Sequence, residues 1–193
     1  MLYKIAHFLR DRYPWIWDVI EKINSFLFRI RYGSTLKGID AILKKYNGEY
    51  VIEQLKEKHL ENLVRFFNEQ PESAFEFFKP HAFDAKTLDK LRRNKSFLTF
   101  VVKENNRIVG YFFLRCFFIG KCFRGKIVDY RHRNKGIAKM MGLIMYDIAH
   151  YLGIPAYSTI SPGNVASIKS SSSVTDFEIL KRLDNGDYYV KYK

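Results

Sequence analysis

The stretch Val128-Asp129-Tyr130-Arg131-His132-Arg133-Asn134-Lys135-Gly136-Ile137-Ala138-Lys139 decides how this chain folds. An apolar, β-branched run ends at Val128, and a polar turn with one glycine follows, which predicts the end of a strand. Apolar residues then recur at helical spacing to Tyr151. A strand, a tight loop and a helix start aim backbone N–H groups and a positive helix-dipole end at one spot. Such a spot favours a phosphate or pyrophosphate.

Four positions in this stretch carry a family resemblance. Val128 is followed five residues later by Arg133, and then by Gly136 and Ala138. This spacing resembles the Arg/Gln-x-x-Gly-x-Gly/Ala acyl-coenzyme A loop of the GCN5-related N-acetyltransferase (GNAT) family. A strand predicted at 156–160 and Asn164 at the start of the next helix agree with that family. The alternative is an ordinary strand-to-helix turn with a solvated basic loop.

The resemblance implies acetyl-coenzyme A as the co-substrate and assigns the residues that bind it. The reaction it implies needs no metal, because positioning, deprotonation of an amine and stabilisation of an oxyanion suffice. The implied cofactor-binding residues are Val128, Arg133, Asn134, Lys135, Gly136, Ile137, Ala138, Lys139 and Asn164.

The catalytic positions depart from the family pattern. Family members often carry a tyrosine seven residues after the asparagine to protonate the leaving thiolate, and here Ser171 occupies that position. His81 is the first candidate base because imidazole titrates near neutral pH, with Asp84 placed to orient it. Asp129 is the second candidate, since it adjoins the loop. A packed or capping role for His81 and a structural role for Ser171 remain open.

The strand before the loop is basic where many relatives carry a carboxylate or histidine. Arg124 cannot act as a base, but together with Arg115 or Lys126 it can pair with phosphates on an acceptor. These three residues are therefore the predicted substrate-binding residues, and they favour an anionic acceptor such as a nucleotide-linked amino sugar.

Composition limits the alternatives. The chain has 193 residues and a formal net charge of +13, which indicates one compact domain with a short extra element and an anionic partner. Cys116 and Cys122 have no metal-type spacing and imply no disulfide framework, so we expect reduced thiols in a cytoplasmic protein. No apolar run approaches the length of a membrane span.

Residues 1–32 contain two amphipathic patterns divided at Pro14, the second with Trp15 and Trp17. Basic residues between the apolar positions favour a helix at the inner face of a membrane. The alternative is that the same apolar face packs on the main domain or on a second copy of the chain. Gly33 predicts a C-cap and Ser34 an N-cap of a further short helix.

The order of elements predicts an α/β (α+β) fold. We expect a mixed, mostly antiparallel sheet of about seven strands flanked by helices, as in the GNAT acyltransferase fold. Residues 1–48 form an N-terminal amphipathic helical extension and residues 49–193 the GNAT-like domain.

Three functions compete at this stage. The first is an acetyl-coenzyme A dependent, bacterial-type N-acetyltransferase acting on a primary amine of a small molecule, such as a nucleotide-linked amino sugar in surface-glycan synthesis. The second is a protein or peptide N-acetyltransferase. The third is a noncatalytic basic module that binds nucleic acid or a membrane; no nucleic-acid signature is visible, so no nucleic-acid partner is expected. A homodimer remains open.

Overall fold

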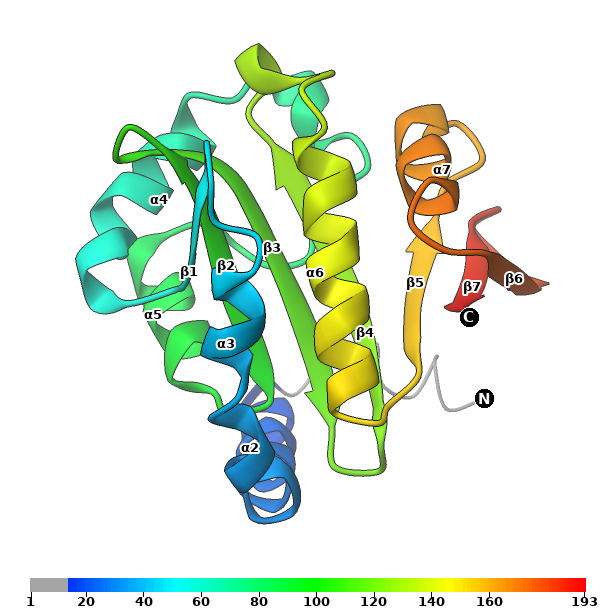
Figure 1. Ribbon diagram of the computed structural model, residues 1–193. Helices are drawn as coiled ribbons and strands as arrows, with labels where there is room; N and C mark the ends of the chain where they lie inside the picture. Colours follow the sequence, from blue (N-terminus) through cyan, green and yellow to red (C-terminus); the bar gives the residue numbers. More distant parts are fainter. Residues whose placement is uncertain (1–13) are drawn as a thin grey trace.

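The computed structural model describes residues 14–193, which form one seven-stranded sheet with helices on both faces (Figure 1). The strand order is β1-β2-β3-β4-β5-β7-β6. The strands are β1 (Val51–Gln54), β2 (Phe97–Glu104), β3 (Arg107–Phe117), β4 (Lys121–Val128), β5 (Ala156–Ile160), β6 (Phe177–Arg182) and β7 (Tyr188–Tyr192). Among these strands only β4 and β5 pair in parallel. The predicted sheet of mostly antiparallel strands is confirmed.

Two hydrophobic clusters cover the two faces of this sheet. In β3, Phe112 and Leu114 belong to one cluster, whereas Tyr111 and Phe113 belong to the other. This alternation follows from the strand period of two, because successive side chains point to opposite faces. The first cluster includes α3 (Ile39–Lys44) and α6 (Ile137–Tyr151), and the second includes α4 (Leu60–Asn68) and α5 (Ala85–Arg93). The short helix α7 (Val165–Ser172) follows β5 and contacts α6.

Helix α2 (Pro14–Leu36) begins at the proline, as predicted, but it does not end at Gly33. The predicted C-cap at Gly33 and N-cap at Ser34 are therefore wrong. Tyr32, only 8% exposed, packs in the core one residue before the glycine. This burial keeps the last turn helical, because tertiary packing outweighs the weak helix propensity of glycine. The first amphipathic pattern, in residues 1–13, lies outside the described residues.

Asn24 fixes α2 to the sheet. Its side-chain nitrogen donates to Ser96 Oγ at 2.9 Å and to the carbonyl oxygen of Cys116 at 3.0 Å, and its side-chain oxygen accepts from the backbone N–H of Phe118 at 3.0 Å. A buried amide with its partners supplied in this way holds a helix in one orientation. Helices α2 and α3 thus share the core of the sheet, and the division at residue 49 remains a prediction.

Candidate active site

Strands β4 and β5 separate soon after they meet. They pair only at Cys122 with Ala156 and at Phe123 with Tyr157, although β4 continues to Val128 and β5 to Ile160. A groove of about 1000 Å³ occupies the divergence and reaches the loop after β4 and the first turns of α6 and α7. A strand edge left unpaired in this way exposes backbone N–H and C=O groups to whatever fills the groove.

The loop after β4 has the conformation that an anion site needs. Asn134 and Gly136 adopt positive φ angles of 63° and 79°, and Gly136 is the N-cap of α6. No described side chain caps this helix end, so the first-turn amides of α6 have no partner there. A Cβ on Gly136 would meet no atom within 4 Å, so the left-handed backbone, not crowding, calls for glycine.

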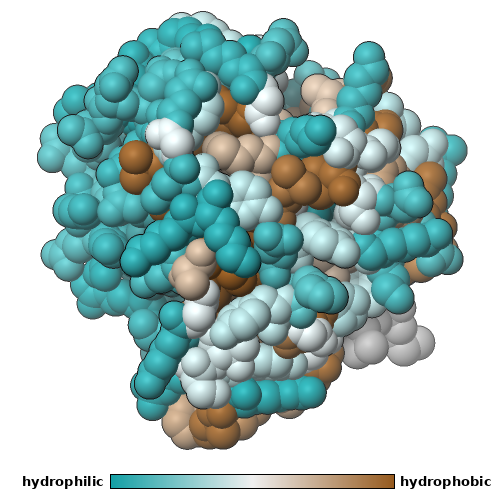
Figure 2. Space-filling model, viewed as in Figure 1, coloured by the Kyte–Doolittle hydropathy of each residue, from teal (hydrophilic) through white to brown (hydrophobic). Residues whose placement is uncertain are grey.

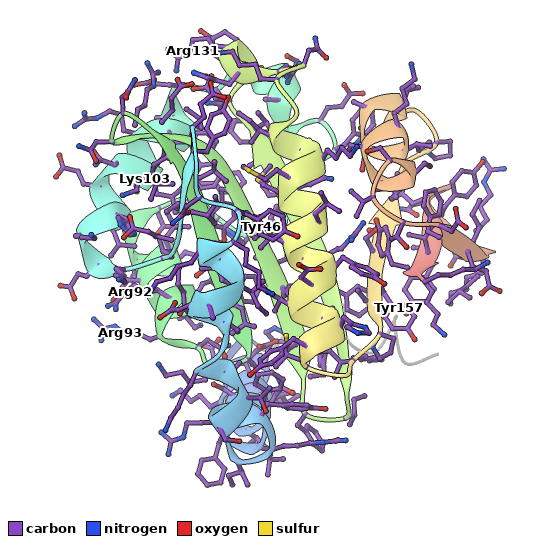
Figure 3. All side chains as sticks on the ribbon, viewed as in Figure 1. Tyr46, Arg92, Arg93, Lys103, Arg131 and Tyr157 are labelled. Atoms are coloured by element: carbon purple, nitrogen blue, oxygen red, sulfur yellow. The ribbon has the colours of Figure 1, made fainter. Side chains whose placement is uncertain are left out.

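A network of ion pairs holds this loop against α4 and the β2–β3 hairpin. Arg131, labelled in Figure 3, donates to both oxygens of Asp129 at 3.1 Å and to Glu69 at 2.6 Å. Glu69 also accepts from Arg107 at 2.6 Å. Burial would raise the pKa of Asp129, but hydrogen bonds from Arg131 outweigh it and hold that pKa below its usual range. Asp129 is 1% exposed and lines neither cavity described here, so it stabilises the loop as a carboxylate.

Lys126 lies beneath the loop as a buried amine. Its Nζ donates to the carbonyl oxygen of Ala138 at 2.8 Å, and its side chain lines the groove. Burial, reinforced by the neighbouring charge of Arg124, lowers the pKa of Lys126 to about 7. A nearby anion would therefore bind a proton together with this lysine.

Hydroxyl groups from three elements meet at the inner end of the groove. Tyr192 of β7 brings its hydroxyl to 2.8 Å from Ser158 Oγ and 3.3 Å from Ser171 Oγ. All three residues line the groove. Ser171 is 1% exposed, and the structure thus gives it a hydroxyl partner from the last strand. Tyr192 and Ser158 were not predicted, because no local pattern shows that β7 lies next to β5.

A second cavity of about 730 Å³ lies on the other side of the strand divergence. Both cavities are lined by Phe77 and Phe78 of the aromatic loop, residues 71–84, and by Arg124, Gly125, Ser158 and Thr159. The second cavity has a cationic and aromatic lining: its charged residues are Lys79, Arg115, Lys121, Arg124 and Lys181. None of the described residues that line it is acidic. Arg115 is paired with Glu21 of α2 and lies over the ring of Trp17.

His81 does not line either cavity. Its Nδ1 lies 2.8 Å from the carbonyl oxygen of Ala82, which can only accept, so this nitrogen donates and Nε2 accepts from the Tyr111 hydroxyl at 3.0 Å. Burial lowers the pKa of His81, against smaller opposing effects of Ala82 and Asp84. Asp84 does not orient the ring but caps α5 through the backbone N–H of Thr87 at 2.9 Å. The geometry gives His81 a packing role, and its catalytic role remains an untested prediction.

The predicted cofactor residues gather on one groove, with one exception. Val128, Arg133, Asn134, Gly136, Ile137, Ala138, Lys139 and Asn164 all line it. Lys135 is exposed and does not. Asn164 uses its side-chain oxygen to cap α7 through the N–H of Ser167 at 3.0 Å, which leaves its NH₂ group to face a ligand. Of the predicted substrate residues, Arg124 lines both cavities, Lys126 the groove and Arg115 the second cavity.

No protein-family model matches the sequence, and no curated protein sequence matches it. Solved structures do match its fold. The PaiA N-acetyltransferase from Thermoplasma acidophilum, in complex with coenzyme A, has a TM-score of 0.64 at 15% identity over 76% of this chain and 99% of that one. The GNAT domain of S. lividans PAT has a TM-score of 0.63 at 13% identity over 73% of this chain and 88% of that one.

A third solved structure has a substrate beside its cofactor. Aminoglycoside acetyltransferase AAC(6')-Ib, in complex with coenzyme A and kanamycin, has a TM-score of 0.59 at 13% identity over 75% of this chain and 94% of that one. At such identities the likeness shows the fold. The chain therefore has the fold of GNAT acetyltransferases, as the loop resemblance predicted.

Proposed function

We propose that this chain, built on the GNAT fold, is an acetyl-coenzyme A dependent N-acetyltransferase that acts on a primary amine of a small molecule. The observation that carries the proposal is the groove between the diverging strands β4 and β5, which ends at the uncapped, Gly136-led start of α6. In this proposal the strand edge at Val128 and Asn164 bind the pantetheine arm, and the loop amides bind the pyrophosphate.

The second cavity is the proposed acceptor site, because it meets the groove at the strand divergence. Its cations favour an acceptor that carries a phosphate or carboxylate next to its amine, and its aromatic rings favour a flat or sugar ring. A nucleotide-linked amino sugar of surface-glycan synthesis fits both conditions. A polycationic acceptor does not, because the described lining offers no acidic side chain to pair with it.

Calorimetric titration with acetyl-coenzyme A tests the cofactor site. Gly136→Trp should abolish binding, since the side chain would project where the pyrophosphate is proposed to lie. Gly153→Trp is the matched control: Gly153 also has a positive φ, of 66°, and a Cβ there also meets no atom within 4 Å, but it follows the far end of α6. No binding by the wild type, or equal loss in both variants, would refute the proposal.

The acceptor class has its own test. Steady-state assays with a panel of amines should show turnover for nucleotide-linked amino sugars and little for polyamines or peptide N-termini. Preference for a peptide amine would support the protein or peptide N-acetyltransferase instead. Salt-dependent retention on nucleic acid without acetyl-coenzyme A binding would support the noncatalytic basic module.

We also propose that α2 rests on an anionic membrane surface. One side of the helix is exposed and apolar, at Trp15, Val19, Ile20, Ile23, Phe26 and Ile30. Figure 2 shows hydrophobic atoms at the lower end of the molecule, where Figure 1 draws α2. Phe118 and Ile119 of the β3–β4 turn are exposed nearby, where Arg31 donates to the Phe118 carbonyl oxygen at 2.8 Å.

The charges beside this apolar surface favour anionic lipid. Lys22, Arg29 and Arg31 are exposed on α2, whereas Asp18 and Glu21 are paired with Lys90 and Arg115 of the main domain. The free charge of the helix is therefore cationic, and basic groups beside an apolar stripe bind anionic lipid surfaces. No described helix is long and apolar enough to cross a membrane.

Vesicle co-sedimentation tests this placement. The wild type should bind phosphatidylglycerol vesicles better than phosphatidylcholine vesicles, and the triple variant Trp15→Ser, Phe26→Ser, Ile30→Ser should not bind. The matched control replaces Val165 and Ile179, which are also exposed and apolar but lie on α7 and β6, by serine. If the wild type ignores vesicles but sediments as a dimer that the triple variant loses, a second copy of the chain covers α2 instead.

A further inference from the structure

Arg124 stands where the two cavities meet. It is one residue beyond the last pair between β4 and β5, and it lines both the groove and the second cavity. If the groove holds the acyl donor and the second cavity the amine, the reacting atoms must meet at this junction, since the two substrates share no other passage in the described structure. Arg124 is therefore positioned at the bond that changes.

The guanidinium of Arg124 lacks a hydrogen-bond partner. The residue is 7% exposed, and neither of its two terminal nitrogens, NH1 and NH2, has a partner among the described residues. Its central carbon lies over the ring of Tyr192, 3.1 Å from the centroid. A buried charge with free N–H donors is costly unless a ligand supplies the anion. The charge remains at neutral pH, because arginine does not deprotonate in proteins.

The groups around Arg124 do not include an anion. The titratable side chains facing it are Cys122 and Lys126 on its own strand and Tyr192 on β7. Two uncharged hydroxyl groups, Ser158 on β5 and Ser171 on α7, contact Tyr192. The junction therefore carries positive charge and hydroxyl dipoles, and it would stabilise negative charge that develops during the reaction.

We propose that Arg124 binds the sulfur end of the thioester and stabilises the thiolate that leaves, with Tyr192 as the residue that positions the guanidinium. This inference rests on the proposed acetyltransferase function. The amine nitrogen attacks the carbonyl carbon and the π electrons move to oxygen, which forms the tetrahedral intermediate. The C=O bond then re-forms, the C–S bond breaks with its electron pair going to sulfur, and the nitrogen proton leaves to solvent.

This arrangement accounts for Ser171, where relatives often have a tyrosine acid. A thiolate held beside a fixed cation leaves without receiving a proton in the same step, because the cation already compensates its charge. The proton can then come from solvent after the product departs. A serine at position 171 thus suffices as a neighbour of the Tyr192 hydroxyl.

Free coenzyme A bound to the protein provides a test that needs no acceptor. A thiol ordinarily titrates near pH 8.5, and the ultraviolet absorbance of the thiolate reports its ionisation. We expect the pKa of the bound thiol to lie at least one unit below that of free coenzyme A, a tenfold or greater shift. Arg124→Met should abolish the shift while calorimetry still detects coenzyme A binding and thermal melting shows an intact fold.

Two further comparisons identify the source of the shift. Lys126→Met removes the neighbouring amine and should leave the thiol pKa lowered. Tyr192→Leu removes the ring under the guanidinium and should weaken the shift, and Tyr192→Phe, which keeps the ring, should restore it. A merely structural tyrosine would affect melting without moving the thiol titration.

The outcomes separate this inference from the proposed function. Absence of coenzyme A binding by the wild type would refute both. Binding with an unshifted thiol, or with the same shift in Arg124→Met, would refute only the role of Arg124. If Arg124→Met leaves the thiol titration unchanged but weakens binding of uridine diphosphate, then Arg124 binds an acceptor phosphate and the inference is also refuted.

Discussion

Lys126 should make cofactor binding depend on pH in a defined direction. Its amine lies under the loop that would bind the pyrophosphate, and burial followed by the charge of Arg124 lowers its pKa to about 7. At pH 8, about one in ten of these amines is therefore charged before the cofactor binds. Anionic phosphates in the groove would favour the charged form, so binding should take up protons.

The size of the effect follows from Coulomb's law. One negative charge at roughly 6 Å with an effective dielectric constant of 20 contributes about 2.8 kcal/mol, which raises the pKa of the lysine by about two units. A pKa moved from about 7 to about 9 changes the protonated fraction at pH 8 from about 0.1 to about 0.9. Binding at that pH should take up about 0.8 proton per site, and acetyl-coenzyme A affinity should fall between pH 7 and pH 9.

Calorimetry in buffers of different ionisation enthalpy measures the proton uptake directly. Lys126→Met should bring it close to zero at pH 8. His132, which also lines the groove, supplies the control: His132→Gln should leave the uptake unchanged. Zero uptake by the wild type, or the same uptake in Lys126→Met, would refute this account of the groove.

The same lysine should affect stability without ligand. Its pKa in the folded protein, about 7, is below the ordinary value near 10.4, so the unfolded chain binds more protons between these values. Stability should therefore rise as pH increases from about 7 to about 10. Urea denaturation should show this rise in the wild type and a smaller one in Lys126→Met.

Three further substitutions test the supports of the site. Asp129→Ala leaves the buried end of its pair with Arg131 empty and should cost about 3 kcal/mol in urea denaturation, with weaker acetyl-coenzyme A binding. Gly125→Ala places a Cβ 2.6 Å from the ring of Phe113, which lines the second cavity, and should raise the acceptor KM more than the cofactor Kd. Asn24→Ala leaves buried groups of the sheet unpaired, should cost about 1–3 kcal/mol, and should increase hydrogen exchange in α2. Unchanged denaturation for Asp129→Ala, an unchanged KM for Gly125→Ala, or unchanged exchange for Asn24→Ala would contradict the corresponding support.

The cofactor groove was predictable because its signals are local. The strand, the Gly136 turn and the start of α6 follow one another within a short stretch, and each has a sequence pattern that depends on its own neighbours. Helix α2 shows the limit of such patterns. Gly33 carries a C-cap signal, but the adjacent Tyr32 is held in a core assembled from distant segments, and this packing continues the helix.

The chemistry at the junction was not predictable for a related reason. Tyr192 is near the end of the sequence and reaches the site only because β7 inserts between β5 and β6 in the sheet. His81 has the right chemistry in the sequence, but the Tyr111 hydroxyl and the surrounding rings occupy it. Residue type predicts what a side chain can do, whereas strand order decides which side chains meet.

The charge of the second cavity also bears on the missing base. An amine that enters among Arg115, Lys121, Arg124 and Lys181 meets positive charge from several directions, with no acidic side chain among the described lining residues. Like charges disfavour the ammonium form, so the pKa of the acceptor amine should fall on binding. An acceptor held by its own phosphate or carboxylate can thus lose its proton to water before it attacks the thioester. In this arrangement the cations that select the acceptor also deprotonate it, and the reaction does not depend on His81.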